Sequence, residues 1–474
     1  MGNNKIRNGF IWKTMERFSV MGVQFLLQLM LARILSPEDF GIVAILTIFV
    51  AFTNVIAQSG LTTALVQKKE ISEIEISSVF NFSIAVGIIA YIIIFISAPY
   101  IGAFFNMPHL VLPLRIIMLS IFPFLYNSVQ ISLLRRELKF KILFLCTIVA
   151  TVLSGGSAIY MALRGYGIWA LIVQQLLYSS IICILIAFIQ KWRPKPVLKL
   201  KIIKPLINYG SKVLGTSLVN ELFVELRTIV IGGMYSASSL AFFNRGRSFP
   251  DLLMKSIIAS MQAVLLPVLS QRQSNIDTLR SATRKSIMLS SYITWPLLTM
   301  LAICAPAFIS LVLTDKWLPC VKFIYIFCIY FSVWPIETIN LQLYYAVGRS
   351  GLVLKIETLR KFFDLVALLA TMYFGVIWIA VGAAIVSVLC IPLYMMSCRT
   401  VINYSIMEQI RDVTPNMITT LLSGVLAYMI SYIEIGNLSL MVLQVITFVL
   451  IYYALSNTFR LRAMEYLKEY VRTR

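Results

Sequence analysis

Charge is scarce in this sequence of 474 residues. Only 13% of the residues are Asp, Glu, Lys or Arg, against about 25% in soluble domains. Apolar residues make up 59%, and the mean hydropathy is +0.86. One soluble globule cannot bury that much apolar surface, so lipid must cover it. Long apolar runs such as residues 84–96 predict an all-α membrane protein, because the strands of a membrane barrel alternate apolar and polar residues.

Histidine and long polar segments are almost absent. The single histidine, His109, excludes a metal site or catalytic triad built on several histidines. The seven cysteines lie mostly within apolar runs without metal-site spacing, and they are interpreted as small apolar fillers. The longest polar connection, residues 191–205, leaves no room for a soluble catalytic domain. We therefore expect no catalytic residues, no metal and no cofactor. The short basic N-terminus has no cleavage site for a signal peptide.

The apolar runs divide into about fourteen segments of membrane-spanning length, at about 20 residues per span. The predicted spans are 9–34, 40–66, 77–97, 111–134, 141–163, 167–190, 206–234, 239–270, 285–314, 320–346, 352–374, 376–398, 413–433 and 437–458.

The net charge of +21 comes from 41 Lys and Arg against 20 Asp and Glu. The basic residues gather in the loops after even-numbered spans, such as 191–205, and at both ends of the chain. This distribution follows the positive-inside rule, so both termini are predicted to be cytoplasmic. Most of the charge then reflects topology, and no nucleic-acid partner is expected.

Weak internal similarity predicts two parallel halves. The matching pairs are Ser36 with Ser236, Gln130 with Gln342, and Trp169 with Trp378. An even number of spans in each half keeps both halves in one orientation, related by an axis along the membrane normal. The expected division is a six-helix bundle over 1–200, a second over 201–404, and two further helices with a basic cytoplasmic tail over 405–474.

Several ionisable residues lie inside predicted spans, where a charge is costly and usually faces a partner or water. The cations expected to contact an anionic cargo are Arg17, Arg115, Arg227, Arg245, Arg247, Lys255 and Arg360. The acids expected as candidates for coupling to H⁺ or Na⁺ are Glu16, Glu221, Glu225, Glu337 and Asp364. Together they predict a hydrated, net cationic cleft between the two halves. The alternative for any one of them is an internal ion pair, such as Asp251 with Arg247. For Arg17, near a span end, snorkelling to the interface is the favoured alternative.

Motifs in a fixed order carry a family resemblance. They include ARILSPEDFG (32–41), LLRRELKFK (133–141), GYGIWALIVQQ (165–175), LINYGSKVLGTSLVN (206–220) and LTDKW (313–317). In these motifs the chain resembles bacterial polysaccharide flippases, over about residues 9–460. The resemblance is to the O-antigen and colanic-acid exporter branch of the multidrug/oligosaccharidyl-lipid/polysaccharide exporter superfamily.

The resemblance implies two six-helix bundles plus two helices in the bacterial inner membrane. It implies a cargo of undecaprenyl-diphosphate-linked oligosaccharide repeat units, moved to the outer leaflet by alternating access. A cationic cavity suits the diphosphate, while the prenyl tail stays in lipid or along the last two spans. Membrane lipids and other polysaccharide assembly proteins are the further partners implied.

Two other functions compete with this one. An ion-coupled exporter of drugs or other lipid-linked precursors belongs to the same superfamily, but a cavity for cationic drugs is expected to be acidic. A membrane glycan transferase or ligase needs a sizeable extramembrane loop with catalytic carboxylates or histidine, and this chain has neither.

Overall fold

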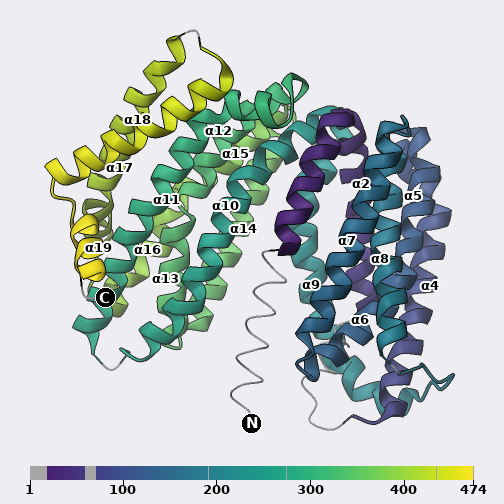
Figure 1. The fold of residues 1–474 in the computed structure, drawn as a ribbon. Helices are drawn as coiled ribbons and strands as arrows, with labels where there is room; N and C mark the ends of the chain where they lie inside the picture. Colours follow the sequence, from purple (N-terminus) through teal and green to yellow (C-terminus); the bar gives the residue numbers. More distant parts are fainter. Residues whose placement is uncertain (1–18, 59–70, 191, 274, 434, 473–474) are drawn as a thin grey trace. The chain divides into compact units, whose positions relative to one another are not determined.

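The computed structural model describes residues 19–58, 71–190, 192–273, 275–433 and 435–472. Every regular element in these ranges is a helix (Figure 1), so the predicted all-α class is confirmed. The chain forms two compact units, Met1–Ala241 and Phe242–Arg474.

The first unit is a set of long helices joined by short turns. Its elements are Ser19–Ile34, α2 (Pro37–Gln58), α4 (Glu73–Phe104), η1 (Pro108–Leu110), α5 (Val111–Ile117), η2 (Met118–Ser120), α6 (Ile121–Arg136), α7 (Phe140–Leu163), α8 (Ile168–Ile189) and α9 (Leu200–Met234). Helices α7 and α8 pack along each other, and α9 packs on α2 and α4.

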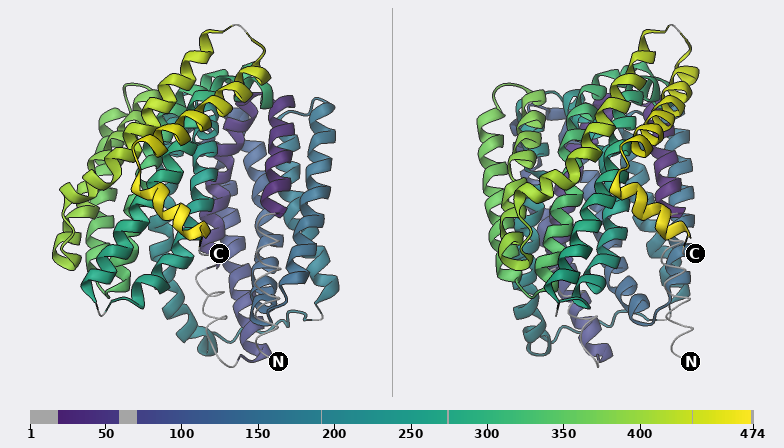
Figure 2. Two further views of the ribbon diagram at one scale, coloured as in Figure 1. Left: turned by 60° about the vertical axis from the view of Figure 1, so that its left-hand side comes forward. Right: turned by 90° about the vertical axis from the view of Figure 1, so that its left-hand side faces the viewer.

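The second unit begins within α10 (Ala237–Ser270). It continues with α11 (Ile276–Val312), η3 (Asp315–Cys320), α12 (Val321–Ser332), α13 (Trp334–Ala346), α14 (Ser350–Thr371), α15 (Val376–Leu389), α16 (Ile391–Ile402), α17 (Ile406–Tyr428), η4 (Met429–Tyr432), α18 (Asn437–Thr458) and α19 (Arg462–Arg472). The C-terminal helices α17, α18 and α19, yellow-green to yellow in Figure 2, all pack on α11.

Hydropathy and exposure identify a multi-pass membrane protein. Eleven helices in the described ranges are long and apolar enough to cross a membrane. Their apolar faces are open: only 11% of the most apolar stretch of α18 is buried, which would be untenable in water. The described part of each of the fourteen predicted ranges falls on a helix or on helices in series; residues 9–18 and 59–66 lie outside the described residues. Three of these helices are not among the eleven that are long and apolar enough to cross a membrane. Ser19–Ile34 is shorter, and α9 and α14 carry several charges.

Local hydrogen bonds cap the start of α2. In the segment SPED, the Ser36 Oγ accepts a hydrogen bond from the Asp39 backbone N–H at 3.2 Å, and the Asp39 carboxylate accepts from the Ser36 N–H at 3.0 Å. Pro37 occupies the first helical position, where no N–H is needed. The reciprocal bonds satisfy N–H groups that the helix itself leaves unpaired.

Residues that match between the two halves of the sequence begin their helices in the same way. Ser236 caps α10 as Ser36 caps α2, by accepting from the Ser239 N–H at 3.2 Å. Helices α8 and α15 both begin after a glycine of positive φ, Gly167 at 53° and Gly375 at 115°. A residue with a side chain is strained in such a conformation. The two halves of the sequence therefore use matching turn chemistry.

Gly246 is the tightest glycine of the second unit, and its replacement by alanine should destabilise that unit. A Cβ there would lie 2.4 Å from the Phe323 Cβ and 2.7 Å from the Cys320 carbonyl oxygen. Overpacking of this kind costs about 1–3 kcal/mol. Thermal unfolding of the purified protein in detergent measures the loss. Gly351→Ala is the matched control, because no atom lies within 4 Å of its Cβ position; equal melting temperatures for both variants would contradict the expectation.

Candidate functional site

A buried ion pair forms the centre of a charged cluster in the second unit. Arg360 of α14 donates from Nη1 to the Glu337 Oε2 of α13 at 2.5 Å. The side chains are only 11% and 4% exposed, respectively. The structure thus brings together a residue predicted to contact cargo and a residue predicted to couple an ion.

Tyr394 of α16 connects this pair to a second acid. Its hydroxyl accepts from Arg360 at 3.1 Å and donates to the Glu357 Oε1 at 3.0 Å. Arg360 also donates to the Ser387 Oγ at 3.5 Å. Arg360 therefore pairs with Glu337 directly and is linked to Glu357 only through the Tyr394 hydroxyl. The Glu337 Oε1 has no hydrogen-bond partner in the described ranges. The charged cluster (Glu337, Glu357, Arg360, Ser387 and Tyr394) has an acidic excess, which suits the uptake of a proton or a small cation.

A second polar site lies in the first unit, and its chemistry is neutral. It is a pocket of about 250 Å³, the amide pocket, between the helix Ser19–Ile34, α7 and α8. Its lining residues are Gln24, Gln28, Thr151, Ser154, Gln174, Gln175 and Tyr178. Thr151 and Ser154 lie near the middle of α7, so the pocket is at mid-depth of a membrane-spanning helix.

The four glutamine side chains of this pocket make no hydrogen bond with any part of the chain that the structure describes. Each carboxamide offers two donors and an acceptor. Gln24 is exposed and the other three are half-buried, so these groups are accessible to a solute that enters the pocket. A hydroxyl-rich solute supplies both donors and acceptors, so the pocket is suited to bind a sugar.

Two of the three predicted cations of α10, Arg245 and Lys255, contact other side chains. Arg245 lies over the ring of the buried Trp317, 5.1 Å from the ring centroid. Asp251 pairs with Lys255 at 2.7 Å, one helical turn later, and not with Arg247. Arg247 is half-buried on the same helix.

The remaining predicted residues are dispersed. Arg115 donates to the Phe95 carbonyl oxygen at 3.2 Å and lies over the Phe95 ring, so it joins α5 to α4. Half-buried positions are occupied on α9 by Glu221, Glu225 and Arg227, and on α14 by Asp364. Glu16 and Arg17 lie outside the described residues.

None of the amide-pocket residues is among the site residues that the sequence predicts. One signal was present: Gln24 and Gln28 are four residues apart and share a helix face. A second was the Gln174–Gln175 pair that ends the motif GYGIWALIVQQ. In the described ranges no group of three or more His, Cys, Asp or Glu side chains could hold a metal ion.

The fold defines a multi-pass, all-helical membrane protein. The chain is similar along its length to a solved structure of the lipid II flippase MurJ in an inward closed conformation, with a TM-score of 0.76 and 14% identity. That match covers 95% of this chain and 98% of MurJ. At this identity the similarity shows the fold.

The sequence comparisons name the family. Residues 30–322 match the family described as polysaccharide biosynthesis protein, and the chain belongs to that family. The predicted resemblance to polysaccharide exporters is thereby confirmed.

Two relatives illustrate the family. The succinoglycan biosynthesis transport protein ExoT of Rhizobium meliloti is 26% identical over 287 residues, which are 60% of this chain and 57% of ExoT, less than two thirds of that protein's length. The teichuronic acid biosynthesis protein TuaB of Bacillus subtilis is 23% identical over 353 residues, which are 73% of this chain and 72% of TuaB.

Proposed function

We propose that this protein is a flippase that moves undecaprenyl-diphosphate-linked oligosaccharide repeat units from the cytoplasmic to the outer leaflet by alternating access. The observation that carries the proposal is the amide pocket, whose four glutamines have no hydrogen-bond partner in the described chain. Carboxamides and hydroxyls are complementary to the hydroxyls of a sugar. The names of relatives in succinoglycan and teichuronic acid biosynthesis support a glycan cargo.

The lipid part of the cargo has a suitable partner in the second unit. An apolar groove of about 460 Å³ runs between α11, α12 and α17, with Trp295, Tyr325 and Met417 among its lining residues. We assign this groove to the prenyl tail, because its apolar lining accommodates a hydrocarbon chain at no cost in buried polar groups. The cations predicted to neutralise the diphosphate remain candidates for that role.

The charged cluster is our candidate for energy coupling. Binding of H⁺ or Na⁺ at Glu337 would weaken its bond to Arg360 and loosen α14 from α13. Binding at Glu357 would weaken its bond to Tyr394 and loosen α14 from α16. No catalytic chemistry is assigned to the protein.

The proposed topology has fourteen spans, arranged as bundles over 1–200 and 201–404 and two helices over 405–474. Both termini face the cytoplasm of a bacterial inner membrane, and the basic loops support this orientation. Membrane lipids and the other proteins of polysaccharide assembly are the proposed partners.

Deletion of the gene in its source bacterium should make the prenyl-linked oligosaccharide accumulate at the cytoplasmic face while surface polysaccharide falls. Lipid extraction followed by mass spectrometry measures the first, and antibody or lectin labelling of cells measures the second. The wild-type gene supplied in trans is the control. Unchanged surface polysaccharide without accumulation of the lipid-linked precursor would refute the proposal.

A further inference from the structure

A second pocket of the second unit has a different chemistry. It encloses about 510 Å³ where α11, α17, the end of α18 and the start of α19 meet. Its charged lining residues are Arg284, Glu408, Arg411, Asp412, Arg460 and Arg462. Some of these charges neutralise one another.

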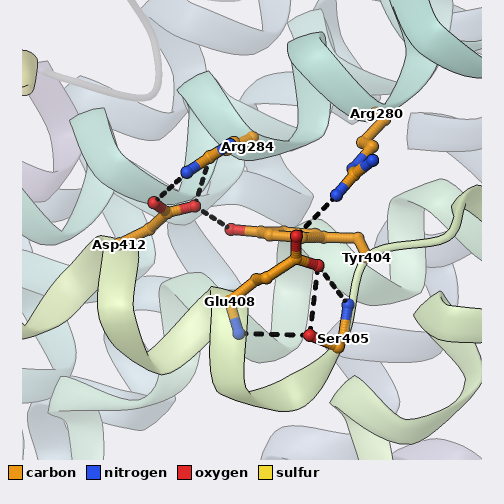
Figure 3. A network of polar contacts seen from close by, with 6 residues as sticks. All are labelled: Arg280, Arg284, Tyr404, Ser405, Glu408 and Asp412. Carbon is orange, nitrogen blue, oxygen red and sulfur yellow. Dashed lines mark hydrogen bonds and ion pairs between the residues drawn. The ribbon is translucent and has the colours of Figure 1, made fainter.

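Asp412 is fully engaged. Arg284 binds it through two parallel bonds, Nε to Oδ2 at 2.5 Å and Nη2 to Oδ1 at 2.6 Å, and the Tyr404 hydroxyl donates to Oδ2 at 2.7 Å (Figure 3). Burial raises the pKa of the Tyr404 hydroxyl, so it stays protonated as a donor. Both oxygens of the carboxylate are therefore occupied.

Glu408 is engaged in the same way. Arg280 donates to Oε1 at 2.6 Å, while the Ser405 N–H and hydroxyl donate to Oε2 at 2.9 and 3.1 Å (Figure 3). The Ser405 contacts form the capping box at the start of α17. Each acid of the pocket is therefore already paired with an arginine, Asp412 with Arg284 and Glu408 with Arg280.

Three arginines of the pocket are not paired with either of these acids. Arg411, Arg460 and Arg462 form no ion pair in the part of the chain that the structure describes. All three are exposed and line one cavity. An anion bound in the cavity would neutralise part of this positive charge. The planar fork of a guanidinium fits phosphate oxygens especially well.

The surroundings of these arginines resemble the edge of a membrane. Phe459, 56% exposed, lines the same pocket. The amphipathic helix α19 follows it: Ala463 and Met464 are buried, while Glu465 and Lys468 face outward. Such a helix, placed directly after a membrane span, fits the headgroup region of a bilayer.

We propose that this arginine pocket binds the phosphate of an anionic phospholipid headgroup and thereby holds α19 against α11 and α17. Basic pockets between membrane helices are known to take lipid phosphates. The same chemistry would accept a free phosphate or pyrophosphate, so the test must separate a membrane lipid from a soluble ion. The site is distinct from the amide pocket and from the charged cluster, so it does not depend on the proposed cargo.

The test uses the full-length protein purified in detergent and native mass spectrometry with added phosphatidylglycerol or phosphatidylcholine. Wild type should bind phosphatidylglycerol at least 10-fold more tightly than phosphatidylcholine. The triple variant Arg411→Gln/Arg460→Gln/Arg462→Gln should lose that preference. The matched control removes three exposed arginines of the same unit outside the pocket, Arg272→Gln/Arg349→Gln/Arg399→Gln, and should keep it.

Three results would overturn the proposal. One is equal lipid binding by wild type and the pocket triple variant. Another is equal loss in the control triple variant, which would indicate a general charge effect. The third is displacement of phosphatidylglycerol by equimolar inorganic pyrophosphate, which would indicate a site for a soluble anion. Because the three arginines are exposed, the pocket variant should fold; replacement of the same residues by lysine should restore part of the lipid preference.

Discussion

Replacing Arg360 with methionine should destabilise the second unit by about 3–5 kcal/mol, which is the usual cost of leaving one partner of a buried ion pair uncompensated. Glu337, 4% exposed, would lose the guanidinium 2.5 Å away and be left as a buried acid without its partner. The Arg360 bonds to Tyr394 and Ser387 would be lost as well. Thermal unfolding of the purified protein in detergent measures the effect.

A double variant separates the ion pair from its surroundings. Glu337→Gln/Arg360→Met removes both charges and should recover most of the lost stability, because a neutral pair in the same volume is tolerated. Lys255→Met is the exposed control: the Lys255 side chain is 62% exposed in its pair with Asp251, and such pairs contribute about 0–1 kcal/mol. If Arg360→Met melts like the Lys255 variant, Arg360 does not stabilise the buried acid.

The same double variant tests energy coupling. A stable protein that no longer exports glycan would support the charged cluster as the ion-binding site. A stable protein with normal export would show that the cluster holds helices together and nothing more.

Loss of the amide pocket should reduce glycan export about 10- to 100-fold. Gln28→Leu/Gln174→Leu removes two carboxamides, and each hydrogen bond to cargo contributes about 0.5–1.5 kcal/mol. Leucine has nearly the volume of glutamine and is more favourable inside a membrane helix. The variant should therefore reach the membrane in normal amounts. Surface polysaccharide in a deletion strain carrying the variant measures export.

Gln271→Leu/Gln273→Leu is the control, because these exposed glutamines lie at the turn between α10 and α11, outside the amide pocket. It should export normally. Export at the wild-type level by the Gln28/Gln174 variant would rule out a role for the pocket in cargo binding.

Helix positions were predictable because hydropathy and capping act over a few residues. Ser36 and Asp39 form their cap within one turn, and the apolar run at 437–458 defines α18 without reference to any other segment. Even the charged helices α9 and α14 lie where the sequence predicts spans.

The pairing of charged side chains was harder to predict from the sequence. The sequence analysis pairs Asp251 with Arg247, one turn before it, whereas the structure pairs it with Lys255, one turn after it. Glu337 and Arg360 are far enough apart in the sequence that two separate roles were reasonable. Arg284 and Asp412 are separated by most of the second unit, and no local pattern links them.

What the sequence alone determined is the membrane character of the chain, the positions of its helices and its family. These properties follow from local composition and from motifs whose residues are neighbours in the sequence. The tertiary structure decided which polar groups are already satisfied and which remain available. Gln24 and Gln174 come to share a pocket, and Arg460 is left with its charge unneutralised, only because helices distant in sequence pack together. Hydrogen bonds and ion pairs act over a few ångströms of space, whatever the distance along the chain.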